Sequence, residues 1–298
     1  MSASVPVPSQ MADGAVERTM TADQRRAFEE LGYLVVPGAI PPVLLDQLRV
    51  AVDQVCDEER RAGRLGPASS LHLLGFLGRH EAFLELLDLP ATFPLVWTLL
   101  GWNIYVYHSH LDVHPPAPVD TTPVWGWHQD GGRQNLELET APRPMLSLKV
   151  AFWLSDVSQP GRGNTLVIPG SHHRNGLPRP DDREHDSARP AGAVELLAKP
   201  GDAVLLDRRL WHSRSVNGSA WTRRALFLAF TYRWVRERDQ HDSGCSPTQW
   251  AALSPIRQQL LGKGADPESF WGLGDDRVPL YDYLRIRGLL DMERPSHR

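Results

Sequence analysis

The run IYVYHSHLDV, residues 104 to 113, opens the part of the chain that decides its fold. It is short, rich in aromatic and β-branched residues, and Pro115-Pro116 follows it closely. Similar short runs follow, with Pro-Gly or Asn-Gly turns among them, at residues 145–154, 166–168, 203–206 and 225–234. Such spacing is typical of antiparallel strands in a sandwich or barrel. We therefore predict a mainly β core.

Helical patterns lie on both sides of this β region. Thr21 and Gln24 form a capping-box signature for a helix of about ten residues, and Pro41-Pro42 opens a second, amphipathic helix. Helix-like spacing of apolar residues returns after Pro247. We expect a disordered tail over residues 1–18 and a single domain over residues 19–298. The domain comprises an N-terminal helical region (19–100), a β core (101–236) and a C-terminal helical region (237–298).

Composition excludes several classes of protein. The 298 residues carry 32 Lys and Arg against 36 Asp and Glu, a net charge of −4, so a nucleic-acid-binding role is not expected. The apolar runs are too short to span a membrane, and the N-terminus lacks the pattern of a signal peptide. Cys56 and Cys245 are too few for a disulfide framework, which favours a cytoplasmic location. The chain is instead notable for 12 His and 10 Trp.

The densest chemical signal is WGWHQDGG, Trp125 to Gly132. His128 and Asp130 are two residues apart, so in an extended segment both side chains project from one face. His212 follows 82 residues after Asp130, a separation that an antiparallel roll can close. Two imidazoles and one carboxylate on one face of a metal form the facial triad of non-haem Fe(II) oxygenases. We predict that these three side chains bind iron and carry the catalysis.

The vacant positions on such a metal serve a chelating co-substrate and dioxygen. The usual co-substrate is 2-oxoglutarate, whose distal carboxylate needs a fixed cation, and the planar fork of Arg suits it. Arg223 lies 11 residues beyond His212, with the Asn217-Gly218 turn between them. We therefore expect Arg223 on a strand that pairs back alongside His212, with Arg224 pointing the other way.

Four motifs together resemble the phytanoyl-CoA dioxygenase family of Fe(II)- and 2-oxoglutarate-dependent oxygenases. They are GYLVVPG at 32–38, HQD at 128–130, GNTLVIPGSH at 163–172, and His212 with Arg223. The resemblance implies a double-stranded β-helix, a cupin-like jelly roll with flanking helices. It also implies a dioxygenase that uses Fe(II), 2-oxoglutarate and O2, supported by ascorbate, and releases succinate and CO2.

The resemblance also assigns further residues. Ser147 matches a family position that hydrogen-bonds the same co-substrate carboxylate as Arg223, and Lys149 lies two residues further on the same strand face. Because relatives that halogenate replace the carboxylate of the triad with a small residue, Asp130 favours hydroxylation. His172, in the PGSH turn, is expected to hold its loop by a hydrogen bond.

The substrate is expected to be a small molecule. We assign cavity-lining or substrate-contacting roles to His108, Asp112, Trp127, Arg133 and Trp211 on their proximity to the triad. A salt bridge is the equal alternative for Arg133. The stretch 172–190 is either a lid or disordered, and its four Arg and four acidic residues cancel, which argues against recognition of a CoA group. A composition rich in Ala, Arg, Gly and Pro is compatible with bacterial specialised metabolism.

Two other functions compete with the oxygenase. A redox-inert metal such as Zn(II) on the same triad would support hydrolysis or isomerisation, and Arg223 would then have no role. A non-catalytic binding protein could also retain the fold, although its metal ligands would be expected to have decayed.

Overall fold

The computed structural model describes residues 19–123, 126–138, 140–178, 189–239, 244–263 and 278–290. The predicted tail, Trp125 and most of the predicted lid lie outside the described residues. The helices are α1 Ala22–Leu31, α2 Pro42–Arg61, α3 Glu81–Leu84, α4 Phe93–Leu100, α5 Gln134–Glu137, α6 Pro247–Ala252, α7 Pro255–Leu260 and α8 Pro279–Ile286, with 3-10 turns Leu77–Arg79 and Ser171–His173. The strands are β1 Tyr33–Val36, β2 Leu71–Leu74, β3 Ile104–His114, β4 Ser147–Trp153, β5 Thr165–Val167, β6 Val194–Glu195, β7 Ala203–Asp207, β8 His212–Arg214 and β9 Arg223–Tyr232.

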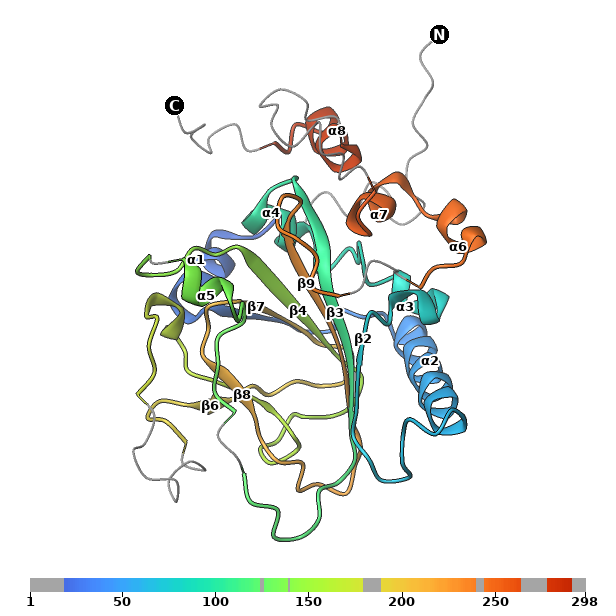
Figure 1. Cartoon of the computed structure of the whole chain (residues 1–298). Helices are drawn as coiled ribbons and strands as arrows, with labels where there is room; N and C mark the ends of the chain where they lie inside the picture. Colours follow the sequence, from blue (N-terminus) through green and yellow to red (C-terminus); the bar gives the residue numbers. More distant parts are fainter. Residues whose placement is uncertain are drawn as a thin grey trace.

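Two antiparallel sheets form the core, as predicted. The larger sheet has six strands in the order β1-β7-β4-β9-β3-β2, and the smaller has three in the order β6-β5-β8. Figure 1 shows the long strands of the larger sheet running through the centre of the molecule, with α2 and α3 beside the β2 edge and α7 and α8 near one end. The fold is mainly β with flanking helices.

The central strands of the larger sheet are buried on both faces. On β4, Leu148, Val150 and Phe152 join the main apolar core, together with residues of α2 and α4. Their neighbours Ala151 and Trp153 join a second apolar cluster on the other face. Because side chains alternate along a strand, one sheet thus packs against helices on one side and faces the smaller sheet on the other.

Strand β3 follows the same alternation with different chemistry. Leu111 and Val113 belong to the main apolar core. The intervening His110 and Asp112, and also His108, are buried and line a cavity on the opposite face. The polar face of the IYVYHSHLDV run therefore points into the cavity, where buried polar groups require hydrogen-bond partners.

Two of the family-like motifs meet at the end of α1. The helix begins with the predicted capping box of Thr21 and Gln24 and ends at Gly32, whose φ is 80°. The Nε2–H of His172 donates a hydrogen bond of 3.0 Å to the carbonyl of Glu29, so His172 holds its loop against α1, as expected. A Cβ on Gly32 would lie 2.6 Å from Nδ1 of His172. This contact explains why the GYLVVPG motif begins with glycine.

Gly32→Ala should destabilise the protein markedly, because it combines a left-handed backbone with a steric clash. We expect the free energy of unfolding to fall by about 2–4 kcal/mol, measured by urea denaturation. Gly38→Ala is the matched control, since Gly38 has a φ of 59° and nothing within 4 Å of a built Cβ. The control should lose only about 1 kcal/mol. Equal losses in the two variants would contradict the steric contribution of His172.

The fold differs from the sequence prediction in its details. The region 19–100, predicted helical, also contributes strand β2, which pairs with β3 at the sheet edge. The apolar spacing after Pro247 forms two short helices, α6 and α7, because Ser254 caps a new helix whose first residue is Pro255. Among the described helices, none has the length and hydropathy that a membrane crossing requires.

Candidate active site

A cavity of about 360 Å³ opens between the two sheets. One side is formed by residues of β3, β4 and β9, and the other by residues of β5 and β8. Five of the 12 histidines of the chain line it: His72, His108, His110, His128 and His212. Part of the high histidine content noted in the sequence therefore lies in this one cavity.

The three predicted metal ligands come together in this cavity. The segment at His128 bridges to β8, because the backbone N–H of each of His128 and His212 donates to the carbonyl of the other at 3.0 Å. Nε2 of His128 and Nε2 of His212 each lie 3.9 Å from Oδ1 of Asp130. Two imidazole nitrogens thus converge on one carboxylate oxygen.

Backbone carbonyls orient both imidazoles in the same way. Nδ1–H of His128 donates to the carbonyl of Gly126 at 2.8 Å, and Nδ1–H of His212 donates to the carbonyl of Leu210 at 2.9 Å. A carbonyl can only accept, so Nδ1 of each imidazole carries a proton and Nε2 is the nitrogen that faces Asp130. Burial also lowers the pKa of His212 to about 4, which keeps its imidazole neutral near neutral pH. Neutral, oriented imidazoles are the form that binds metal.

Asp130 pairs with Lys149 across the cavity. Nζ of Lys149 lies 2.5 Å from Oδ2 of Asp130, and both side chains are nearly buried. Burial alone would raise the pKa of Asp130, but the Lys149 ammonium and His212 hold it well below its usual value. Lys149 was assigned to the co-substrate carboxylate from the sequence, whereas its partner in the structure is the acidic member of the triad.

Lys149→Met should tighten the binding of a divalent metal to the triad. The substitution removes a cation that pairs with one oxygen of Asp130 and repels an incoming metal, so we expect about tenfold tighter binding of Mn(II) by calorimetry. The metal-free variant should also unfold at a lower temperature, because Asp130 loses its partner. Lys199→Met, at an exposed lysine, is the control and should change neither quantity. Unchanged or weaker metal binding in Lys149→Met would refute this role.

The turn after the HQD motif is shaped around a second buried cation. Gly131 has a φ of 118°, and a Cβ there would overlap the guanidinium of Arg208. Arg208 is 2% exposed and donates to the carbonyl of Asp130 and to the side-chain oxygens of Gln134 and Asn135. Its role was not visible in the sequence, where Arg208 sits in a run of polar residues with no motif. Arg208 therefore fixes the backbone that carries Asp130.

Arg223 lies in the same cavity as the triad, but on the opposite sheet. It begins β9, which pairs with β3 and β4, whereas His212 is on β8 of the smaller sheet. The prediction that Arg223 pairs back alongside His212 was therefore wrong. The Asn217-Gly218 turn lies in a connection that crosses between the sheets rather than in a hairpin within one. Arg224 points outward and pairs with Asp53 of α2 at 2.7 Å, as the alternation predicted.

The Arg223 side chain is fully enclosed and incompletely paired. Its guanidinium carbon lies 4.8 Å from the ring centroid of Trp153, and Nη1 lies 3.5 Å from Oδ2 of Asp112. Its buried Nε has no hydrogen-bond partner among the described residues. Burial lowers its pKa to about 10, so the group remains a cation near neutral pH. A buried guanidinium with a free donor is suited to a carboxylate ligand.

Ser147 cannot share a carboxylate with Arg223. Ser147 pairs with Thr231 at one end of β9, and Arg223 is at the other end, eight residues away. At roughly 3.3 Å per residue the two are separated by about 26 Å along the strand. Ser147 Oγ instead lies 3.2 Å from the hydroxyl of Tyr107. Thr165 of β5 lines the cavity together with Arg223, and its hydroxyl was missed in the sequence prediction.

Three predicted substrate residues do not line the cavity. Trp127 and Trp211 pack in an apolar cluster with Leu166, on the face opposite to the triad, because each precedes a ligand histidine in an extended segment. They therefore pack against the side of the ligand-bearing strands that faces away from the cavity. Arg133 is exposed and its Nε pairs with Glu137 at 2.6 Å, so the salt-bridge alternative holds.

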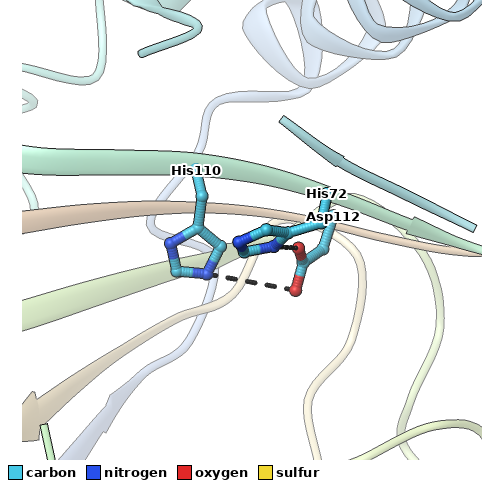
Figure 2. Close-up of side chains that lie close together, drawn as sticks. All are labelled: His72, His110 and Asp112. Atoms are coloured by element: carbon cyan, nitrogen blue, oxygen red, sulfur yellow. Dashed lines mark hydrogen bonds and ion pairs between the residues drawn. The ribbon is translucent and has the colours of Figure 1, made fainter. Parts of the chain in front are cut away.

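The other two predicted substrate residues, His108 and Asp112, do line the cavity. They stand in a row on β3 with His110, and His72 joins them from β2; Figure 2 shows how His72, His110 and Asp112 converge. His72 was not predicted from the sequence. The period-two alternation of β3 had already suggested His110 as a further possible lining residue beside His108 and Asp112.

Comparisons with known proteins agree with this geometry. The family model "Phytanoyl-CoA dioxygenase (PhyH)" matches residues 75–225, about half of the chain. The chain belongs to the phytanoyl-CoA dioxygenase family. Membership makes it an oxidoreductase of the dioxygenase type, and it favours this class over the hydrolase and binding-protein alternatives.

Individual proteins that are similar to this chain match most of its length. The uncharacterized protein Mb1539 of Mycobacterium bovis is 26% identical over 255 residues, which cover 83% of this chain and 89% of that protein. The structure of HygX from Streptomyces hygroscopicus, with nickel and 2-oxoglutarate bound, has a TM-score of 0.59 at 16% identity, over 74% of this chain and 90% of its own. The carbocyclase SnoK from nogalamycin biosynthesis has a TM-score of 0.56 at 22% identity, over 78% and 93%. The latter two confirm the jelly-roll fold.

Proposed function

We propose that the protein is an Fe(II)- and 2-oxoglutarate-dependent dioxygenase that oxidises a C–H bond of a small molecule, with hydroxylation as the default outcome. His128, Asp130 and His212 would hold the iron, and Arg223 would bind the distal carboxylate of 2-oxoglutarate. When bound, the iron and the co-substrate together supply the oxidising power of dioxygen, with release of succinate and CO2.

One observation carries this proposal. Two imidazoles with Nδ1–H fixed on backbone carbonyls aim their Nε2 atoms at one carboxylate oxygen, each from 3.9 Å. A hydrogen-bonded surface pair would not need two oriented imidazoles aimed at one carboxylate oxygen. Two imidazole nitrogens and one carboxylate oxygen suit Fe(II), and they leave room for exchangeable ligands. HygX, a structural neighbour, has nickel and 2-oxoglutarate bound.

The chain's own residues would perform distinct tasks around these groups. The carbonyls of Gly126 and Leu210 keep the imidazoles in the ligating tautomer. Lys149 would hold the outer oxygen of Asp130, leaving the other oxygen for the metal. Arg223, stacked on Trp153, has a free Nε donor that would bind a carboxylate in an enclosed, weakly screened position.

The substrate is proposed to be a small polar molecule of bacterial specialised metabolism. A volume of about 360 Å³ lies at the low end of the range for small-ligand pockets. The wall of histidines and Asp112 favours polar groups on the substrate. SnoK acts in nogalamycin biosynthesis as a carbocyclase, so ring closure is a further outcome that the same fold supports. A reducing, cytoplasmic location fits the two free cysteines, Cys56 and Cys245.

The test is oxygen-dependent formation of succinate from 2-oxoglutarate by the purified protein with Fe(II) and ascorbate. We expect slow uncoupled turnover without a substrate, which stops when oxygen or iron is omitted or when Zn(II) replaces Fe(II). If neither metal-dependent binding of 2-oxoglutarate nor any turnover is observed, the proposal fails.

A further inference from the structure

A second group of metal-binding side chains lies on the edge strands β2 and β3. His72 stands directly opposite Asp112 in the antiparallel register, and His110 is two residues before Asp112 on the same strand face. Ligand atoms of the three side chains all lie within 4.8 Å of one another. Figure 2 shows the two imidazoles gathered on the same side of the strand pair around the Asp112 carboxylate.

A chain of hydrogen bonds fixes the direction of the His110 ring. Oδ1 of Asp239 accepts from Nδ1–H of His108 at 2.7 Å, and Nε2 of His108 shares a hydrogen bond of 3.0 Å with Nδ1 of His110. Because Nδ1 of His110 is engaged with His108, Nε2 is the nitrogen of His110 that remains for another ligand. The ring of His110 also stacks on Phe227 at 4.3 Å between centroids, which holds its direction. A metal-binding histidine is oriented in the same way.

Nε2 of His110 faces a second electron-rich atom. It lies 3.9 Å from Oδ2 of Asp112, which is too long for a hydrogen bond between the two atoms. Asp112 is ionised, because His114, His72 and Arg223 hold its pKa below the usual range against the effect of burial. Burial lowers the pKa of His110 to about 2, so His110 is neutral. The separation of 3.9 Å is close to the sum of a metal–nitrogen and a metal–oxygen bond, each of about 2 Å, so a divalent metal would fit between the two atoms.

The Asp112 carboxylate has three further neighbours besides His110. Nδ1–H of His72 donates to Oδ1 at 2.7 Å, and its largely exposed imidazole can release that proton to solvent when a metal binds. Nη1 of Arg223 donates to Oδ2 at 3.5 Å and Nε2 of His114 lies 3.6 Å from it, so both contacts are long and a metal would share Oδ2 with them. Lys149, another cation of the cavity, is occupied by Asp130.

We propose that His72, His110 and Asp112 form a second metal site, separate from the triad of His128, Asp130 and His212, for a divalent cation that prefers imidazole, such as Zn(II). Two imidazoles and one carboxylate suit zinc and its neighbours rather than Ca²⁺ or Mg²⁺, which prefer oxygen ligands. The site would tie edge strand β2 to β3 at the wall of the cavity. It does not depend on the identity of the metal at the triad.

The test is the zinc stoichiometry of the full-length protein after removal of metals with a chelator. Isothermal titration with Zn(II) should give two equivalents for wild type, one for His128→Ala, one for His72→Ala and none for the double variant. Leu74→Ala is the matched control on the same short strand and should retain two equivalents. His110→Gln should also lose one equivalent, and thermal melting should show that each variant is folded.

Anomalous diffraction from zinc-soaked crystals would locate the second ion. We expect a peak between Nε2 of His110 and Oδ2 of Asp112 in wild type and in His128→Ala, and no peak there in His72→Ala. A single equivalent in the folded wild-type protein, or a second equivalent that persists in both His72→Ala and His110→Gln, would overturn the proposal. So would a second ion located elsewhere. Because His128→Ala separates the two sites, failure of the iron assignment would leave this result interpretable.

Discussion

Replacing His128 with alanine is expected to lower oxygen-dependent succinate formation by roughly a thousandfold or more, because the triad loses one of its two imidazole ligands. The Nε2 of this residue is already aimed at Oδ1 of Asp130 from 3.9 Å. Its side chain is 56% exposed, so its removal should not create a buried void. The measurement is the rate of succinate release with saturating Fe(II) and 2-oxoglutarate.

The control for His128→Ala is His173→Ala, which removes an exposed imidazole outside the cavity that donates to the carbonyl of Glu29. It should retain wild-type turnover. Metal content alone is not decisive, since the proposed second site would keep one ion. Unimpaired turnover by His128→Ala would show that the iron is held elsewhere.

Arg223→Ala is expected to raise the dissociation constant for 2-oxoglutarate by about a hundredfold in the metal-loaded protein. The loss of a buried, charge-assisted carboxylate contact costs about 2–5 kcal/mol, and each 1.4 kcal/mol is about tenfold in affinity. Arg223→Lys should be intermediate, because it keeps the charge and loses the planar fork. Calorimetry with Mn(II) under anaerobic conditions measures the dissociation constant for 2-oxoglutarate in both variants.

Arg224→Ala is the matched control for this experiment. Arg224 is the next residue of β9, and its side chain pairs with Asp53 on the outer face. It should change the affinity for 2-oxoglutarate by less than about threefold. If Arg223→Ala binds 2-oxoglutarate as tightly as Arg224→Ala does, Arg223 is not the anchor and the redox-inert alternative gains support.

Local patterns in the sequence were sufficient to predict the β core and the grouping of the three triad residues. Short β-prone runs with Pro-Gly turns predicted the strands, and the spacing of His128 and Asp130 placed both on one face. The same alternation of side chains along a strand predicts that Trp127 and Trp211 point away from the cavity, which contradicts their assignment as substrate residues. The structure corrects that assignment with the cluster around Leu166.

Sequence spacing could not supply the strand order. Ser147 and Arg223 belong to neighbouring strands, yet the register places them at opposite ends of that pair. Offsets along the chain carry no information about register, which long-range pairing decides. Strand β2 was missed for a different reason. Its four residues are too few to show a period, and its contribution of His72 to the cavity depends on pairing with β3.

The most direct test of the central claim is turnover under ¹⁸O-labelled dioxygen. The Fe(II)-loaded protein, given 2-oxoglutarate and ¹⁸O₂, should form succinate that carries one ¹⁸O atom, detected by mass spectrometry, and Arg223→Ala should form far less at the same co-substrate concentration. Succinate without the label, or no succinate from folded, iron-loaded protein, would contradict the assignment as a 2-oxoglutarate-dependent dioxygenase.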